Sequence, residues 1–229
     1  MREKNDPTRA GFTPVSVPNA KLSGNEIDAI CQKAARGAGF SWGLAEESGF
    51  AARWLCMRGI DGCGSLLARL DFETGISRSM ELKDGEIQSL DASPLCPIAT
   101  GAALSDFAGS QKKCTKAGPV FLPVLVLPFA HQIARVAGGT VGLEWQQGKV
   151  TVSETGQING ALDRLFLTKI ADIGISPVAG VIDGSAGEHA PVSASKDTLE
   201  QLNTYASRTY VPASAASRAD AGSAGGDND

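Results

Sequence analysis

The residues best suited to binding a ligand lie near the C-terminus, where two arginines stand among hydroxyl side chains. The five candidate ligand-binding residues are Arg208, Tyr210, Ser214, Ser217 and Arg218. An arginine offers a planar fork of N–H donors that fits a carboxylate or a phosphate, and serine and tyrosine hydroxyls can orient the same anion. The segment therefore predicts part of a binding site for a small anionic metabolite.

The same stretch has a second interpretation. The seventeen residues 213–229 contain six alanines, three serines and three glycines, a composition typical of a disordered tail. Directly before them, Tyr210-Val211-Pro212 carries apolar groups that favour burial. We therefore treat residues 213–229 as a tail that is either ordered against the domain or disordered.

His131 and Cys96 are the candidates for catalytic chemistry. His131 follows a strongly apolar run, where it is either a general base at the end of a buried strand or an ordinary hydrogen-bonded helix residue. Cys96 precedes Pro97 at the expected start of a helix, whose N-terminus stabilises a thiolate. It is either a nucleophile or a buried, inert thiol. No partner base for Cys96 can be assigned from the sequence.

The sequence predicts no metal and no cofactor. His131 and His189 are the only histidines and have no ligand spacing, and the five cysteines form no C-x-x-C pair. Gly37, Gly39 and Gly43 resemble a dinucleotide fingerprint only loosely, and they lie between two expected helices instead of after a strand.

Composition excludes several classes of protein. A net charge of −4 on 229 residues argues against nucleic-acid binding, which needs a basic face. No run approaches the eighteen or so apolar residues of a membrane span, and the N-terminus lacks the apolar core of a secretory signal. An odd number of cysteines fits reduced thiols. We therefore expect a cytoplasmic protein without membrane contact.

The chain divides into a flexible leader at 1–21, a single domain at 22–212 and the tail at 213–229. In the domain, Ser23 and Glu26 have the spacing of a capping box, and apolar periodicity predicts helices up to Gly37 and from Ser41 to about Arg58. Many small residues allow these two helices to pack closely as a hairpin. A third short helix is expected over 65–70.

Strands are expected in the middle of the chain. Asp84-Gly85 predicts a turn between short strands, the apolar run 120–127 predicts a strand buried on both faces, and alternation over 141–152 predicts a hairpin. One or two strands are expected over 171–182, and a helix from Ser195 to about Arg208. The fold class is therefore α+β, with an N-terminal helical hairpin, a central antiparallel or mixed sheet and a C-terminal helix.

Several stretches resemble an uncharacterised bacterial family of unknown function. They are Lys33-Ala-Ala-Arg-Gly-Ala-Gly-Phe-Ser-Trp-Gly-Leu-Ala-Glu-Glu47, Ala51-Ala-Arg-Trp-Leu55, the segment 93–106 and the ending Arg208-Thr-Tyr-Val-Pro-Ala-Ser214. The resemblance covers most of residues 22–229. The resemblance implies domain boundaries, but the family has no established activity that could be assigned to this chain.

The first helical hairpin is also similar to the opening of the malate and lactate dehydrogenases of the second, non-Rossmann type. The similarity rests on Arg58-Gly-Ile-Asp-Gly62 followed by Ser65-Leu-Leu-Ala-Arg69. In that family a histidine that takes part in the chemistry follows this turn, whereas this chain has Cys63-Gly64-Ser65.

Three functions remain open on the sequence. The preferred one is binding of a small anionic carboxylate or phosphate through the C-terminal segment, with catalysis only if His131 or Cys96 converges with arginines in one cavity. The second is a non-catalytic accessory or interaction subunit of a metabolic complex, whose hairpin 25–58 packs against a partner or its own copy. The third is a divergent, fragment-like relative of the dehydrogenases named above.

Overall fold

The computed structural model describes residues 19–72, 76, 79–108, 115–178 and 192–210. These residues form seven α-helices, one short 3-10 helix, a two-stranded sheet and a mixed sheet of seven strands. The fold is α+β with an N-terminal helical hairpin and a C-terminal helix, as the sequence predicts. The expected leader, apart from residues 19–21, and the expected tail lie outside the described residues.

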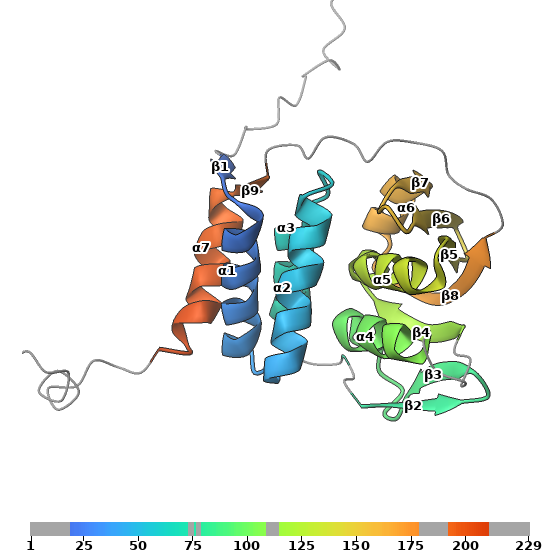
Figure 1. Cartoon of the computed structure of the whole chain (residues 1–229). Helices are drawn as coiled ribbons and strands as arrows, with labels where there is room; N and C mark the ends of the chain where they lie inside the picture. Colours follow the sequence, from blue (N-terminus) through green and yellow to red (C-terminus); the bar gives the residue numbers. More distant parts are fainter. Residues whose placement is uncertain (1–18, 73–75, 77–78, 109–114, 179–191, 211–229) are drawn as a thin grey trace, which may run out of the picture.

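Four helices form a layer on one side of the molecule (Figure 1). They are α1 (Gly24–Gly37), α2 (Trp42–Cys56), α3 (Gly62–Asp71) and α7 (Lys196–Ser207). Strand β1 (Asn19–Lys21) pairs antiparallel with β9 (Ser193–Ser195), so the segments that lead into α1 and α7 lie side by side.

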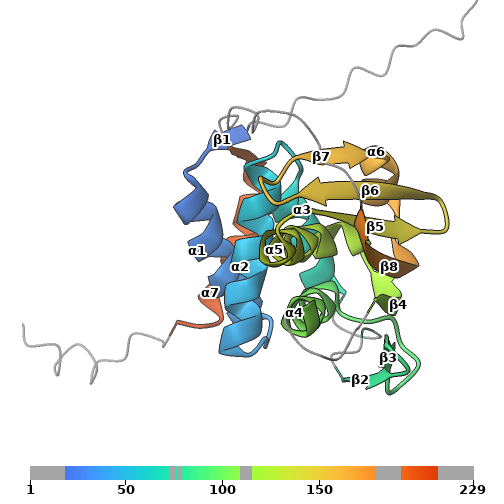
Figure 2. The same cartoon turned by 45° about the vertical axis from the view of Figure 1, so that its right-hand side comes forward.

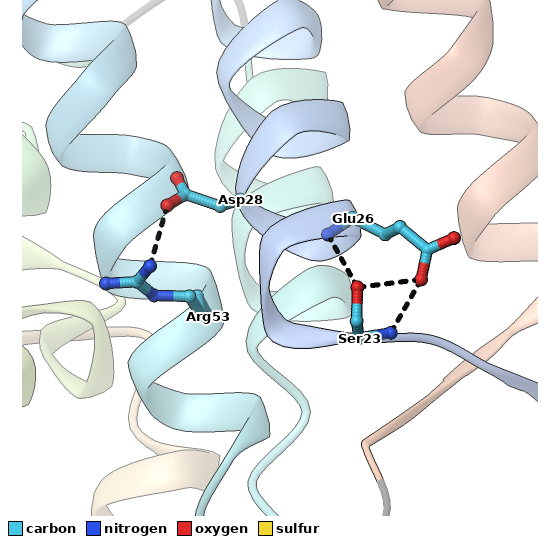
Figure 3. A network of polar contacts seen from close by, with 4 residues as sticks. All are labelled: Ser23, Glu26, Asp28 and Arg53. Atoms are coloured by element: carbon cyan, nitrogen blue, oxygen red, sulfur yellow. Dashed lines mark hydrogen bonds and ion pairs between the residues drawn. The ribbon is translucent and has the colours of Figure 1, made fainter.

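Side chains at the start of each helix explain where it begins. The capping box predicted for α1 is present: Ser23 Oγ accepts from the Glu26 N–H, and Glu26 accepts from the Ser23 N–H at 2.7 Å (Figure 3). Ser41 caps α2 with a single bond, in which its Oγ accepts from the Leu44 N–H at 3.3 Å. The third helix begins at Gly62 and not at residue 65, because the Asp61 carboxylate accepts from the Gly64 N–H at 2.8 Å.

The large sheet has the strand order β2-β3-β4-β8-β5-β6-β7, in which only β3 and β4 run parallel. Its strands are β2 (Met80–Lys83), β3 (Glu86–Ser89), β4 (Lys116–Phe121), β5 (Thr140–Trp145), β6 (Gly148–Ser153), β7 (Ile158–Gly160) and β8 (Ile170–Val178). The predicted turn at Asp84-Gly85 and the predicted hairpin over 141–152 are confirmed. One strand expected over 171–182 is confirmed as β8, which continues through Pro177, and residues 179–182 lie outside the described residues.

Two helices lie between the helical layer and the sheet (Figure 2). They are α4 (Pro97–Ala108) and α5 (Leu127–Ala137), and both pack against α2. A further short helix, α6 (Leu162–Leu167), follows β7 and packs against β6. The core is therefore shared by helices and sheet, with Phe129 of α5 fully buried in it.

The predicted strand over 120–127 is wrong, although its burial is confirmed. Strand β4 ends at Phe121, Leu122 adopts a left-handed φ of 45°, and Pro123–Val126 form a 3-10 helix that leads into α5. Proline has no N–H for a strand ladder and a fixed φ, and both Pro123 and Pro128 sit in the first turns of the helices that replace the strand. A continuous apolar run alone does not distinguish a buried strand from a buried helix.

Close packing of α1 and α2 depends on glycine, as the small residues of the sequence predict. A Cβ atom added at Gly49 would lie 2.8 Å from the carbonyl oxygen of Asp28 on α1. A Cβ atom at Gly43, on the same helix, would meet nothing within 4 Å. The ion pair between Arg53 and Asp28, 3.1 Å apart, joins the two helices at the same level (Figure 3).

No helix formed by the described residues is long and apolar enough to cross a membrane.

We expect Gly49→Ala to lower the free energy of unfolding by about 2 kcal/mol, because the new methyl group must push two packed backbones apart. Gly43→Ala is the matched control, and we expect it to raise stability by about 0.5 kcal/mol because alanine favours the helix where space is open. Urea unfolding of both variants measures the difference. Equal stabilities would contradict the close helix contact.

Candidate functional site

His131 lies on α5 with its ring half-buried against strand β6. Its Nδ1 is 3.1 Å from the carbonyl oxygen of Ser153. Because a carbonyl can only accept, Nδ1 carries the proton of the neutral ring and Nε2 presents a lone pair. Burial lowers the pKa of His131, and the charges of Arg58 and Arg135 lower it further, against the opposing effect of the Ser153 hydrogen bond. The imidazole is therefore in the neutral form that a base requires.

Trp54 and Arg58 of the helical layer meet His131. The ring centroids of Trp54 and His131 are 5.4 Å apart, and the Arg58 Cζ atom lies 3.8 Å from the Trp54 ring centroid. We call these three residues the Arg58–Trp54–His131 cluster. It places a cation, an aromatic ring and a neutral imidazole in contact at the junction of α2, α5 and the turn after β6.

Two backbone carbonyls hold Arg58 in place. Its Nε donates to the carbonyl oxygen of Gly156 at 2.9 Å, and its Nη1 donates to that of Trp54 at 3.1 Å. Gly156 has a φ of +84°, and a Cβ atom there would lie 3.0 Å from the Arg58 Cζ, so both the backbone conformation and the guanidinium require glycine. The contact joins the end of α2 to the turn after β6.

Arg58 is a half-buried cation without a counterion in the described part of the chain. Burial lowers its pKa to about 10, which still leaves it charged at neutral pH. Arg53, five residues earlier on α2, is paired with Asp28, whereas no carboxylate of the described residues lies within 4 Å of the Arg58 guanidinium nitrogens. Two of its five N–H groups are used by the carbonyls named above.

Trp54 adds a second unsatisfied donor to the cluster. Its side chain is 6% exposed, and its Nε1 has no hydrogen-bond partner among the described residues. A buried N–H without an acceptor costs about 1–3 kcal/mol, and a bound water or ion is a common explanation for one. The donors of the cluster thus exceed the acceptors that the described protein provides.

An open surface cavity of about 420 Å³ lies between α4 and α5. It is lined by Ser105, Asp106, Gln132, Arg135 and Val136. The Ser105 hydroxyl donates to Gln132 Oε1 at 3.2 Å, which fixes the two polar groups of the lining. Arg135 stands one helical turn after His131, on the same face of α5. The cluster residues Arg58, Trp54 and His131 are not part of the lining, and only the charge of Arg135, which lowers the pKa of His131, relates the two.

Glu47 of α2 is close to this cavity. Burial raises the pKa of its carboxyl, and the neighbouring charges of Asp106 and Glu46 raise it further. The approach of Asp106 from α4, which the sequence does not predict, gives Glu47 a second acidic neighbour.

The structure does not bring Arg208 and Tyr210 to this site. Arg208 lies over the Tyr205 ring at 4.3 Å, Tyr205 donates to Asp71 Oδ1 at 3.0 Å, and the Tyr210 side chain is 62% exposed. Helix α7 lies at the far edge of the helical layer, with α1 and α2 between it and α5 (Figure 1). Ser214, Ser217, Arg218 and His189 lie outside the described residues.

Cys96 occupies the predicted position, directly before α4, but its side chain is fully buried. Its carbonyl accepts from the Thr100 N–H at 2.9 Å as the first turn of the helix forms. A nucleophile must contact its substrate, so Cys96 cannot act on one in this conformation. The burial fits the second interpretation of Cys96, an inert thiol in the core.

Three other cysteines meet inside the helical layer. The Cys63 sulfur lies 3.9 Å from that of Cys31 and 3.8 Å from that of Cys56, and all three residues are buried. Contact with Cys63 and burial raise the pKa of Cys56 well above the ordinary value. Contact with Cys31 and burial raise the pKa of Cys63 in the same direction, against the opposing effect of its contact with Cys56. No group of three or more His, Cys, Asp or Glu side chains among the described residues is arranged to hold a metal ion.

The fold shows an α+β protein and no narrower class. A comparison of sequences finds a family match for part of the chain. Residues 22–116 match the model of a family described as "Protein of unknown function (DUF3726)". This match confirms the predicted resemblance for α1–α4, including Trp54 and Arg58, whereas His131 and the ending 208–214 lie outside it. No curated protein and no solved structure matches the chain.

The sequence indicates His131 as a candidate but neither Arg58 nor Trp54. A lone arginine at the end of a helix is ordinary, because it also favours the helix C-terminus. What makes Arg58 unusual is its contact with Gly156, which is ninety-eight residues away in the chain.

We expect the stability of the protein to fall on acidification because His131 is buried in its neutral form. In the unfolded chain His131 takes up a proton near pH 6.5, whereas in the folded chain its pKa is lower. The stability that the neutral His131 contributes is therefore fully present above pH 6.5 and is lost as the pH falls below it. His131→Asn should remove most of this loss between pH 7.5 and 5.5, measured by urea unfolding. The control is His189→Asn, and a loss that disappears in the control instead would contradict the assignment.

We expect the four buried thiols Cys31, Cys56, Cys63 and Cys96 to resist alkylation by iodoacetamide in the native protein and to react fully in urea. Peptide mass spectrometry after timed labelling assigns each site. Rapid native labelling of Cys96 would contradict its burial and restore it as a candidate nucleophile.

Proposed function

We propose that the protein binds a small anionic metabolite, a carboxylate or a phosphate, at the Arg58–Trp54–His131 cluster. The observation that carries this proposal is the half-buried Arg58 guanidinium, which has no carboxylate partner in the described chain. A desolvated cation gains most from an anion that enters its site, since Coulomb attraction is stronger there than in water.

The cluster is suited to an anion in two further respects. The Trp54 Nε1–H is an additional donor without an acceptor among the described residues, and Arg135 adds a second positive charge close enough to lower the pKa of His131. The whole protein carries a net charge of −4, so this local concentration of positive charge and donors is opposite in sign to the net charge.

His131 has a defined role in this proposal. Its Nδ1–H is held by the Ser153 carbonyl, so the Nε2 lone pair can accept a hydrogen bond or a proton from a hydroxyl group of the ligand. This is the one feature that favours an enzyme over a simple binding protein. A 2-hydroxy acid would use both halves of the site, its carboxylate on arginine and its hydroxyl on His131.

The interaction-subunit alternative has weaker support on the hairpin 25–58 than the sequence suggests. Of the large exposed hydrophobic side chains on the described surface, only Trp42 belongs to that hairpin, and Arg36 stacks over its ring at 4.4 Å. A broad apolar patch, which such an interface requires, is absent from the described surface of this hairpin.

Thermal unfolding with a panel of phosphates, monocarboxylates and 2-hydroxy acids tests the proposal. A ligand at a hundredfold its Kd should stabilise the intact protein by about 2.7 kcal/mol, a shift of several degrees in Tm. We expect Arg58→Lys and Arg135→Gln to reduce this shift strongly. Lysine keeps the charge of Arg58 and so limits the loss of folding stability.

The matched control is Arg208→Ala, at the site that the sequence alone predicts. If the shift survives in Arg58→Lys but disappears in Arg208→Ala, the anion binds at the C-terminal segment and not at the cluster. If no compound shifts the intact protein, anion binding at either place is wrong.

A further inference from the structure

A second surface, around α6, combines apolar side chains with unpaired cations. Phe166, Leu167 and Ile170 are 41%, 77% and 49% exposed, and they fall within five residues of one another. The large exposed hydrophobics elsewhere on the described surface, such as Trp42, Phe72, Leu90 and Val136, are spread over different elements. Single exposed apolar residues are ordinary in proteins, whereas a group of three needs an explanation.

A surface cavity of about 700 Å³ lies beside these side chains. It is lined by Gln147, Arg164, Leu167, Thr168, Lys169 and Ile170. Its apolar part comes from Leu167 and Ile170, and its cations are Arg164 and Lys169. Neither cation forms an ion pair with a carboxylate of the described residues, and the acidic neighbour Asp163 is not part of the lining.

The backbone around the cavity is fixed before any ligand binds. Leu165 is fully buried and anchors α6, and the Thr168 hydroxyl donates to the Arg164 carbonyl at 2.7 Å. The Leu122 N–H donates to the Lys169 carbonyl at 2.7 Å, while Arg164 Nη1 donates to the Gln147 carbonyl at 3.3 Å. The cations and the apolar side chains are thus presented by a rigid connection between α6 and β8.

We propose that this cavity binds a small amphipathic anion, a carboxylate with a hydrocarbon chain. Lys169 and Arg164 would contact the carboxylate, and the chain would cover Leu167 and Ile170, which buries apolar surface that the free protein exposes. A volume of about 700 Å³ is within the range of small-molecule sites. A symmetric contact with a second copy is disfavoured, because it would bring the same two cations together.

Isothermal titration with decanoate, below the concentration at which it forms micelles, tests the proposal on the full chain. We expect saturable binding with a negative heat-capacity change, and binding of decanol that is at least tenfold weaker because it lacks the charge. Lys169→Glu and Leu167→Glu should each weaken decanoate binding by about tenfold or more. Both side chains are exposed, so these variants should fold.

The controls are Leu90→Glu and Lys196→Glu, which make the same changes at exposed positions elsewhere and should leave decanoate binding unchanged. Arg58→Lys should also leave it unchanged, which separates this site from the proposed anion site at α5. Absence of saturable binding, or equal weakening by the controls, overturns the proposal. A dimer in light scattering that Leu167→Glu converts to monomer would also overturn it, because a second copy would then be the occupant.

Discussion

Close approach of helices at glycine is the constraint on which the arrangement of this molecule depends. Gly49 meets Asp28 of α1, Gly62 meets the carbonyl of Ala52, and Gly101 of α4 packs on the ring of Phe129. Each position lacks room for a methyl group, so α2 is fixed against α1 and α3, and α4 is fixed against α5. Trp54 lies on α2 and Arg58 just after it, so both meet His131 where α2 packs against α5.

Arg58 combines a structural and a chemical property in one side chain. Its hydrogen bond to Gly156 joins the helical layer to the turn after β6, and its stacking on Trp54 keeps the guanidinium from being solvated freely. A residue needed only for that link could form it without a charge. The fold uses the hydrogen bond of Arg58, but the side chain also carries a positive charge. The proposal that Arg58 binds an anion rests on that charge.

The sequence predicts those features whose cause is local. The capping box of Ser23 and Glu26, the hairpin over 141–152 and the helix before Arg208 each follow from residues within a few positions of one another. The apolar run 120–127 was misassigned because burial is compatible with either secondary structure. The site was only half predicted: His131 was found by its residue type, but its partners come from α2 and from Gly156, which are adjacent only after folding.

The order of strands has a consequence for how the chain must assemble. Strand β8 lies between β4 and β5 and pairs with both, so the two parts of the sheet, β2-β3-β4 and β5-β6-β7, are joined only once residues 170–178 are in place. The family-matched segment 22–116 ends within β4 and contains neither β8 nor α7. We infer that residues 22–210 form one cooperative unit, and that the matched segment, cut out and expressed alone, would expose the sides of α1 and β3 that pack against α7 and β4 and would aggregate.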